Sequence, residues 1–293
     1  MATLHERKAR AFALWAQVSG DSSLRREAKR AETAAQTTRE MHINRTARAS
    51  GGNTAGEDRP ETQDRPAAED GLVVERLLTR GQAAHARAVL EYVATNTPCP
   101  EPEVRLAVLM LVLRTARAGT GNLTGQDLTG WVQDDAARVL EQLVAEDWLR
   151  LPGTVADVMA SRPEDPTPIT VPTLLPEQPR PFKFGKNNRS RISGWAQKVA
   201  GDRKLRKKKA GAATRLLALC TAAHSRPDGC LGSLQDGGLP LDRVAAFCGV
   251  SPEHVAEHAD LLVTADWLTE TVTDQGQLQG QLTERALPLS ALL

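Results

Sequence analysis

The stretch LDRVAAFCGVSPEHV, residues 241–255, carries the most informative local pattern in the sequence. Two short helices that cross closely need a small residue where they approach, and Ala245 supplies one. Gly249, four positions later, can adopt the positive φ that a tight turn between helices requires. Val255 then places a branched apolar side chain where it would face the first helix. The stretch therefore predicts two short helices joined by a tight turn.

The residues after this turn predict the start of the second helix and the element that comes next. Ser251 is a favourable N-cap, and Pro252 is a favourable first residue of a helix. β-branched residues alternate along residues 267–273, and polar and apolar residues alternate along residues 277–282. The sequence Asp-Gln-Gly at residues 274–276 suits a turn between them. A β-hairpin is therefore expected after the second helix.

This order of a helix, a helix-turn-helix pair and a hairpin resembles a winged helix-turn-helix domain, as found in bacterial transcription regulators and plasmid replication initiators. The resemblance implies that the partner is double-stranded DNA and that the second helix lies in the major groove. Ser251, His254 and His258 are the residues through which this helix would reach the DNA. The bias toward Ala, Arg, Leu and Thr resembles that of actinobacterial proteins.

Two pairs of similar segments indicate an internal duplication. The tripeptide Trp-Ala-Gln occurs at residues 15–17 and again at residues 195–197. The sequence LVAEDWL at residues 143–149 matches LVTADWL at residues 262–268, in the same order along the chain. The predicted fold is therefore mainly α, with two duplicated winged helix-turn-helix modules that carry small β-hairpin wings.

The two copies are expected to differ in detail. Counting back without gaps from the matched segments places Gly130 opposite Gly249, so the turn of the first copy is expected around Gly130. Residues 151–155 leave room only for a short wing in the first copy. Trp148 and Trp267 are expected to occupy equivalent sites, each packing on the first helix of its own module.

Composition changes along the chain predict the domain boundaries. Eight of the seventeen prolines lie between residues 152 and 181. This density disfavours both helices and sheet hydrogen bonding, so a stiff linker is expected there, with a second module that is stable alone. The predicted parts are an N-terminal helical repeat box at 1–48, a disordered acidic linker at 49–70, a helical insert (two short helices broken at Gly81) with the first winged-helix module at 71–155, a Pro-rich linker at 156–185, and a basic arm with the second winged-helix module at 186–293.

The net charge of +1 conceals a strong asymmetry. Residues 180–209 contain twelve Lys or Arg and one acidic residue, a local net charge of +11, so the rest of the chain carries −10. Such a basic block favours contact with a polyanion, because each phosphate that it neutralises releases counterions. We expect a flexible arm followed by a helix that begins after residue 202. The predicted phosphate contacts are Lys186, Arg189, Arg191, Lys198, Arg203, Lys204, Arg206, Lys207, Lys208 and Lys209.

The second helix of the motif departs from the pattern of DNA-reading helices. It carries Glu253, Glu257 and Asp260, and it has no Lys or Arg. Acidic side chains are repelled by phosphates, so the helix could instead contact a protein. Two alternatives to a transcriptional regulator or mobile-element accessory protein therefore stay open. One is a protein–protein adaptor that uses acidic winged-helix surfaces, and the other is a plasmid replication or partition protein.

The remaining patterns predict no catalytic chemistry. The four cysteines form no CxxC pair, and no glycine-rich phosphate loop or nucleophile motif is recognisable. We therefore expect no enzyme activity, no cofactor and no metal. The N-terminus lacks the apolar stretch of a signal peptide, and no apolar run is long enough to span a membrane. The expected location is the cytoplasm, in association with the nucleoid, and a homodimer or a protein partner stays open.

Overall fold

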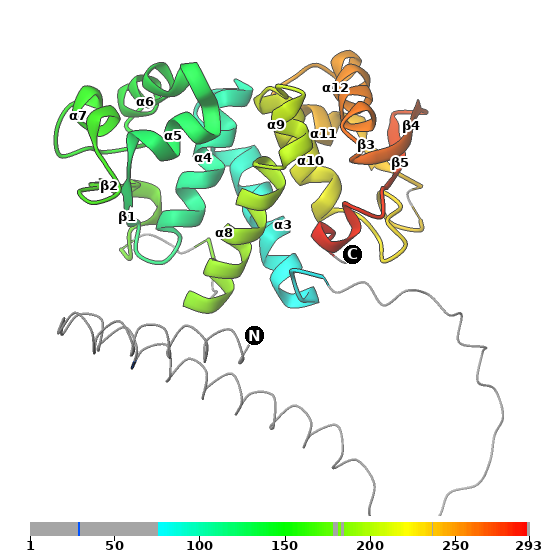
Figure 1. The fold of residues 1–293 in the computed structure, drawn as a ribbon, viewed down its shortest axis with the longest axis horizontal. Helices are drawn as coiled ribbons and strands as arrows, with labels where there is room; N and C mark the ends of the chain where they lie inside the picture. The colour runs from blue at the N-terminus through cyan, green and yellow to red at the C-terminus, as the bar shows by residue number, and fades with distance from the viewer. Residues whose placement is uncertain (1–28, 30–75, 178–180, 183–184, 236, 292–293) are drawn as a thin grey trace, which may run out of the picture. The chain divides into compact units, whose positions relative to one another are not determined.

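The computed structural model describes residue 29 and residues 76–177, 181–182, 185–235 and 237–291 (Figure 1). The fold given below is that of the unit formed by residues 71–293. The expected repeat box around residues 15–17 and the expected linker at 49–70 lie outside the described residues. The described part is mostly helical with small antiparallel sheets, as the sequence predicts.

The first half of this unit, residues 76–177, begins with a long helix. Thr79 and Gln82 form a reciprocal capping box, which satisfies free backbone N–H groups at the helix start. The helix runs through Gly81 without a break, so the prediction of two short helices is wrong. The elements of this half are α3 (Arg80–Asn96), α4 (Pro102–Thr115), β1 (Thr120–Leu123), α5 (Gly125–Val132), η1 (Gln133–Asp135), α6 (Ala136–Ala145), α7 (Val155–Ala160), β2 (Thr167–Thr170) and η2 (Pro172–Leu174).

The second half, residues 181–291, combines helices with a three-stranded sheet. Its strands are ordered β3-β5-β4, with antiparallel pairing. The hairpin turn at Gln275 (φ 48°) and Gly276 (φ 73°) lies at the predicted position. The elements are α8 (Lys186–Ala200), α9 (Arg203–Lys207), α10 (Ala212–Ala223), β3 (Leu239–Pro240), α11 (Leu241–Cys248), α12 (Pro252–Thr264), β4 (Leu268–Asp274), β5 (Gln277–Leu282) and η3 (Leu287–Leu289).

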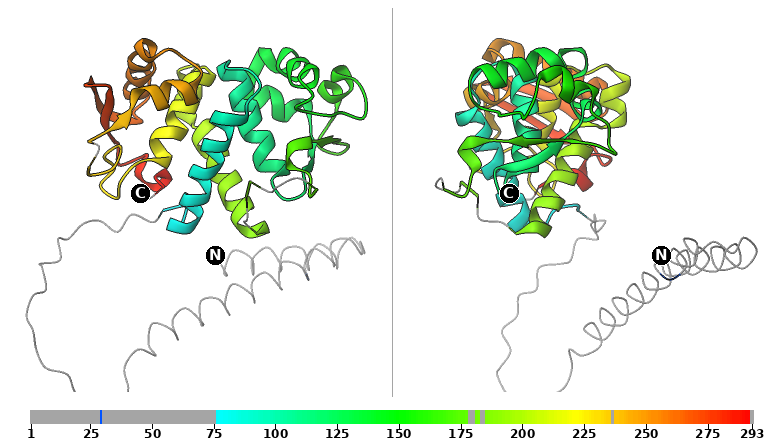
Figure 2. Two further views of the ribbon diagram at one scale, coloured as in Figure 1. Left: turned by 180° about the vertical axis from the view of Figure 1, so that it is seen from behind. Right: turned by 90° about the vertical axis from the view of Figure 1, so that its left-hand side faces the viewer.

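The two halves share one hydrophobic core. Every residue of α10 is buried, and so is nearly every residue of α4, so both helices are covered on all sides. They pack against each other, and α3 and α8 each pack against both of them (Figures 1 and 2). The second half is therefore not the separately packed module that the sequence suggested.

Two arginines, one in each half, stabilise the contact between the halves. Arg105 on α4 donates to the carbonyl oxygens of Ala246 and Phe247 in the last turn of α11. Arg215 on α10 donates to the carbonyl oxygen of Trp131 in the last turn of α5, at 3.0 Å. Each half thus supplies a cation to helix-end carbonyls of the other half, where a positive charge is favourable.

The predicted Pro-rich linker is wrong over much of its length. Residues 155–160 form α7, which begins where the segment expected for the first wing ends, and residues 167–170 form β2, which pairs with β1. Prolines are compatible with these elements because Pro168 lies in a short two-stranded sheet and Pro172 begins a 3₁₀ turn. Ile169 is buried and anchors the segment on the core. Thr170, at the end of β2, also forms an isolated antiparallel bridge with Arg150.

The turn between α11 and α12 has the predicted geometry. Gly249 has a φ of 70°, and a Cβ atom there would lie 2.1 Å from the carbonyl oxygen of Pro100, so glycine is required for two reasons. In the first half the corresponding positive φ belongs to Gln133, at 55°, whereas Gly130 lies inside α5. The ungapped count therefore misplaced this turn, because α6, with ten residues, is three residues shorter than α12, with thirteen.

Trp148 and Trp267 have the same local backbone setting. Each follows an Asp with positive φ, and each donates its backbone N–H to a leucine carbonyl oxygen, of Leu143 at 3.0 Å and of Leu262 at 2.9 Å. The indole of Trp267 donates to the hydroxyl of Thr221 on α10, as expected for packing on the first helix. The indole of Trp148 donates instead to the carbonyl oxygen of Asn96, at the end of α3.

Candidate nucleic-acid interface

The basic block of the sequence is divided by α8. This helix has fifteen residues, which at 1.5 Å per residue separates its ends by about 22 Å. Lys186, Arg189 and Arg191 lie near its start, whereas the cations of α9 follow its end (Figure 1). Ile192, Trp195 and other apolar residues of the block are buried and hold α8 on the core. The expected flexible arm is therefore helical from Lys186 onward, and the block forms two basic regions.

The region at the start of α8 has fewer exposed cations than α9, because one of its three turns inward. Arg189 turns inward, and its guanidinium lies 3.4 and 3.3 Å from the carbonyl oxygens of Leu113 and Arg114 in the last turn of α4. Arg189 therefore supplies hydrogen-bond donors to carbonyl groups at the end of α4 rather than facing solvent. Lys186 and Arg191 are exposed, and Lys198 is exposed farther along α8.

Helix α9 places cations at the surface around a single apolar anchor. Asp202 caps the helix by accepting from the backbone N–H groups of Lys204 and Leu205. The carboxylate of Asp202 also accepts from Arg285 at 2.7 Å, and Leu205 is fully buried. Because the cap and the anchor fix the helix, the positions between them point outward. All six Lys and Arg residues of residues 203–209 are exposed.

Five of these six cations have no acidic partner among the described residues. Lys204 forms an ion pair with Asp266, which lies just after the end of α12. We call the other five, which form no ion pair with any described residue, the α9 cation cluster. It consists of Arg203, Arg206, Lys207, Lys208 and Lys209. This cluster is the most concentrated set of unpaired positive charge in the part of the chain that the structure describes.

The predicted DNA-contacting residues of α12 do not form one exposed face. Ser251 and His254 are exposed and bonded to each other, with 2.7 Å between the hydroxyl oxygen and Nδ1. His258 is half-buried and its Nδ1 lies 3.0 Å from the hydroxyl of Thr214 on α10. Burial lowers the pKa of His258, so the ring is neutral at pH 7 and faces the core.

The exposed face of α12 is acidic, and η1 and α6 together carry three acidic residues and one Arg. Glu253, Glu257 and Asp260 are exposed on α12. The only cation of α6, Arg138, forms ion pairs with Glu101 and Asp135. Neither helix therefore offers an unpaired cation to a phosphate.

Metal and thiol sites are not evident in the described residues. No group of three or more His, Cys, Asp or Glu residues is placed to hold a metal ion there. Cys220 and Cys248 are buried, and burial raises the pKa of the Cys220 thiol to about 12. In the same residues, no helix is both long enough and apolar enough to cross a membrane.

Sequence reasoning missed two features that depend on packing. One is the pair Arg105 and Arg215, each of which donates to carbonyl oxygens of the other half. The other is a cavity between α3 and α11. Both join residues far apart in the sequence, and no local pattern marks either. Comparison with known proteins adds no further constraint: no family model, no curated protein and no solved structure matches this chain.

Proposed function

We propose that the protein binds double-stranded DNA through the α9 cation cluster, with contacts to phosphates rather than to base edges. The observation that carries the proposal is the cluster itself: five exposed cations within seven residues, without acidic partners among the described residues. Such a surface favours strong, salt-dependent and sequence-tolerant binding, because its main contribution is counterion release.

We further propose that the two halves are duplicated winged helix-turn-helix modules. The second half supports this with the order α10, β3, α11, α12, β4 and β5 and the sheet order β3-β5-β4. The first half has α4, β1, α5, α6 and β2 in the same order, with α7 in place of a hairpin wing. The matching backbone around Trp148 and Trp267 and the reciprocal pair Arg105 and Arg215 add support.

A transcriptional regulator or a mobile-element accessory protein is the role that suits this combination best. Plasmid replication or partition requires the same DNA contact. The structural argument is therefore for the DNA-binding activity, whichever of these processes uses it.

The salt dependence of binding tests the proposal. A random-sequence duplex should bind at low salt, and log K should fall linearly with log[salt]. Five neutralised phosphates give a slope of about −4.5. Fluorescence anisotropy with a labelled duplex at several salt concentrations measures it. If the purified protein binds neither double-stranded nor single-stranded DNA at low salt, the proposal fails.

A protein–protein adaptor is the second candidate, and the acidic faces of α12 and of η1 with α6 favour it. Here Glu253, Glu257 and Asp260, which are exposed on α12, would dock a basic partner. The α9 cation cluster would then keep the protein soluble without binding DNA.

Neutralising the acids of α12 separates the two candidates. Replacing Glu253 and Glu257 with Gln should strengthen non-specific DNA binding about two- to fivefold, because it removes repulsion without removing a contact. Anisotropy at fixed salt measures this change, and Glu146→Gln with Glu164→Gln, in the first half, serves as the matched control. If the α12 changes leave DNA binding unaltered but abolish capture of a basic protein partner, the adaptor is the better description.

A further inference from the structure

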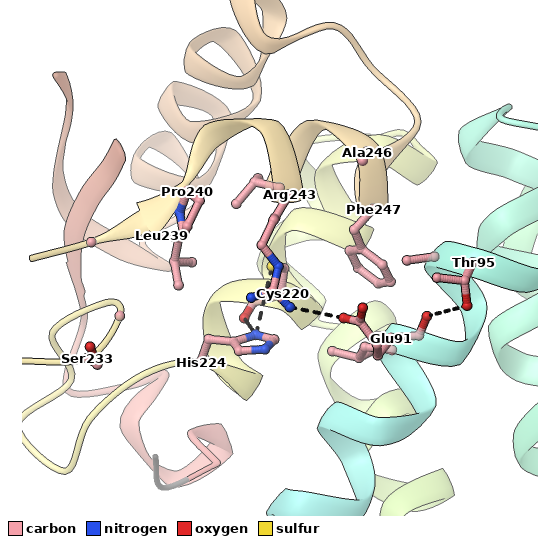
Figure 3. Close-up of a pocket in the computed structure, with 15 residues that line it drawn as sticks. Glu91, Thr95, Cys220, His224, Ser233, Leu239, Pro240, Arg243, Ala246 and Phe247 are labelled. Atoms are coloured by element: carbon pink, nitrogen blue, oxygen red, sulfur yellow. Dashed lines mark hydrogen bonds and ion pairs between the residues drawn. The ribbon is translucent and has the colours of Figure 1, made fainter. Parts of the chain in front are cut away.

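A cavity of about 510 Å³ lies between α3 of the first half and α11 of the second (Figure 3). Leu90 and Ala94 from α3 and Val244 and Phe247 from α11 form apolar walls. The volume lies within the range of about 300–1,000 Å³ that is usual for small-molecule sites, which are likewise apolar with a few polar groups. The cavity is therefore large enough to enclose an organic ligand.

An exchangeable ion pair lies at one side of this cavity. The guanidinium of Arg243 is 3.1 Å from the carboxylate of Glu91, and both side chains are largely exposed (Figure 3). An exposed pair of this kind contributes little to stability, so its loss costs little. A ligand carboxylate can thus replace Glu91 as the partner of Arg243 and gain a bidentate contact.

His224 supplies a second, neutral polar group. Its Nδ1 lies 3.0 Å from the carbonyl oxygen of Cys220, which can only accept, so Nδ1 carries the proton and Nε2 is an acceptor. Burial lowers the pKa of His224, and the ring is therefore neutral at pH 7. The charged groups that act on it are Arg87, Arg243 and Glu91.

We propose that this cavity binds an apolar monocarboxylate, with its carboxylate on Arg243 and its aromatic or aliphatic body between Leu90 and Phe247. The apolar walls disfavour a sugar-like or highly charged ligand, because many of its polar groups would lose their hydration without new partners. Arg243 is the one Lys or Arg residue in the lining of the cavity, which matches a single carboxylate. This proposal stands on the cavity and does not depend on DNA binding.

Titration calorimetry with 1-naphthoate and with decanoate, on the full chain at pH 7, tests the site. At least one should bind with one-to-one stoichiometry and a dissociation constant of about 1 mM or lower. The neutral 1-naphthamide should bind at least about tenfold more weakly than 1-naphthoate, because it lacks the charge that Arg243 recognises.

Variants then distinguish a ligand contact from a structural role. Arg243→Gln should weaken carboxylate binding about tenfold or more, whereas Glu91→Gln should strengthen it by freeing Arg243. Ala94→Phe should abolish binding by filling the cavity, with an unchanged circular dichroism spectrum as the check on folding. Arg191→Gln, an exposed arginine on α8, should have no effect.

The proposal is overturned by any of three results. The first is the absence of saturable binding of both carboxylates. The second is binding that Arg243→Gln leaves unchanged, and the third is binding that survives Ala94→Phe in a folded protein.

Discussion

Replacing Lys207, Lys208 and Lys209 with Glu lowers the affinity for a random duplex by about two to three orders of magnitude at low salt, if the α9 cation cluster contacts phosphates. The change removes three favourable contacts and introduces three repulsive charges. All three side chains are exposed and form no ion pair with a described residue, so their replacement removes no ion pair from the described structure. Anisotropy titrations of the variant and the wild type measure the loss.

A neutral version of this variant gives a more exact measurement. Replacing the same three lysines with Gln should reduce the steepness of the salt dependence by about 2.7, which is about 0.9 for each phosphate contact removed. Lys186→Glu with Arg191→Glu is the matched control for the charge-reversal variant, because these cations lie at the opposite end of α8. Equal losses per reversed charge in the control and in the cluster variant would show that net charge alone, rather than the cluster, determines binding.

The second large effect concerns Trp267, which is completely buried and whose indole donates to Thr221 at 3.1 Å. Trp267→Ala should lower the free energy of unfolding by about 3–5 kcal/mol, because it leaves a large cavity. Trp267→Phe retains most of the apolar contact and should cost about 1–2 kcal/mol. Urea unfolding followed by circular dichroism measures both values.

The shared core adds a qualitative expectation for the same variant. Because α4 and α10 pack against each other, the two halves should unfold together rather than one module at a time. Trp131 and Trp148 lie in the first half and Trp195 lies in the second, so tryptophan fluorescence of the variant reports on both halves. The fluorescence change and the circular dichroism change should occur at the same urea concentration. A fluorescence transition at distinctly higher urea would mean that the halves are independent.

Local chemistry explains which parts of the fold were predictable from the sequence. The turn at Gly249 and the hairpin at Gln275 and Gly276 were placed correctly, because each requires a residue that tolerates positive φ. The turn at Gln133 was misplaced, since a non-glycine residue with positive φ gives no such signal. The strand β2 was missed because its pairing with β1 overrides the local effect of proline.

The candidate sites were less predictable, because a sequence shows which residues are charged but not whether their side chains face solvent or the core. Arg189 and Arg206 look alike in the basic block, yet Arg189 satisfies carbonyl groups of α4 while Arg206 faces solvent. His258 was expected to face DNA but bonds to Thr214. The cavity between α3 and α11 depends entirely on how the halves pack, and no local pattern could have indicated it.

Cutting the chain between Glu177 and Gly185 would leave two polypeptides that need each other. The N-terminal piece would expose the flank of α4 that α10 covers, and the C-terminal piece would expose the matching flank of α10. Expressed alone, each piece is expected to aggregate. Expressed together, they can restore the common core, and Arg105 and Arg215 again reach their carbonyl partners on the other piece. The protein is therefore suited to fragment complementation, because the packing surfaces of its own core would direct the two pieces to reassociate.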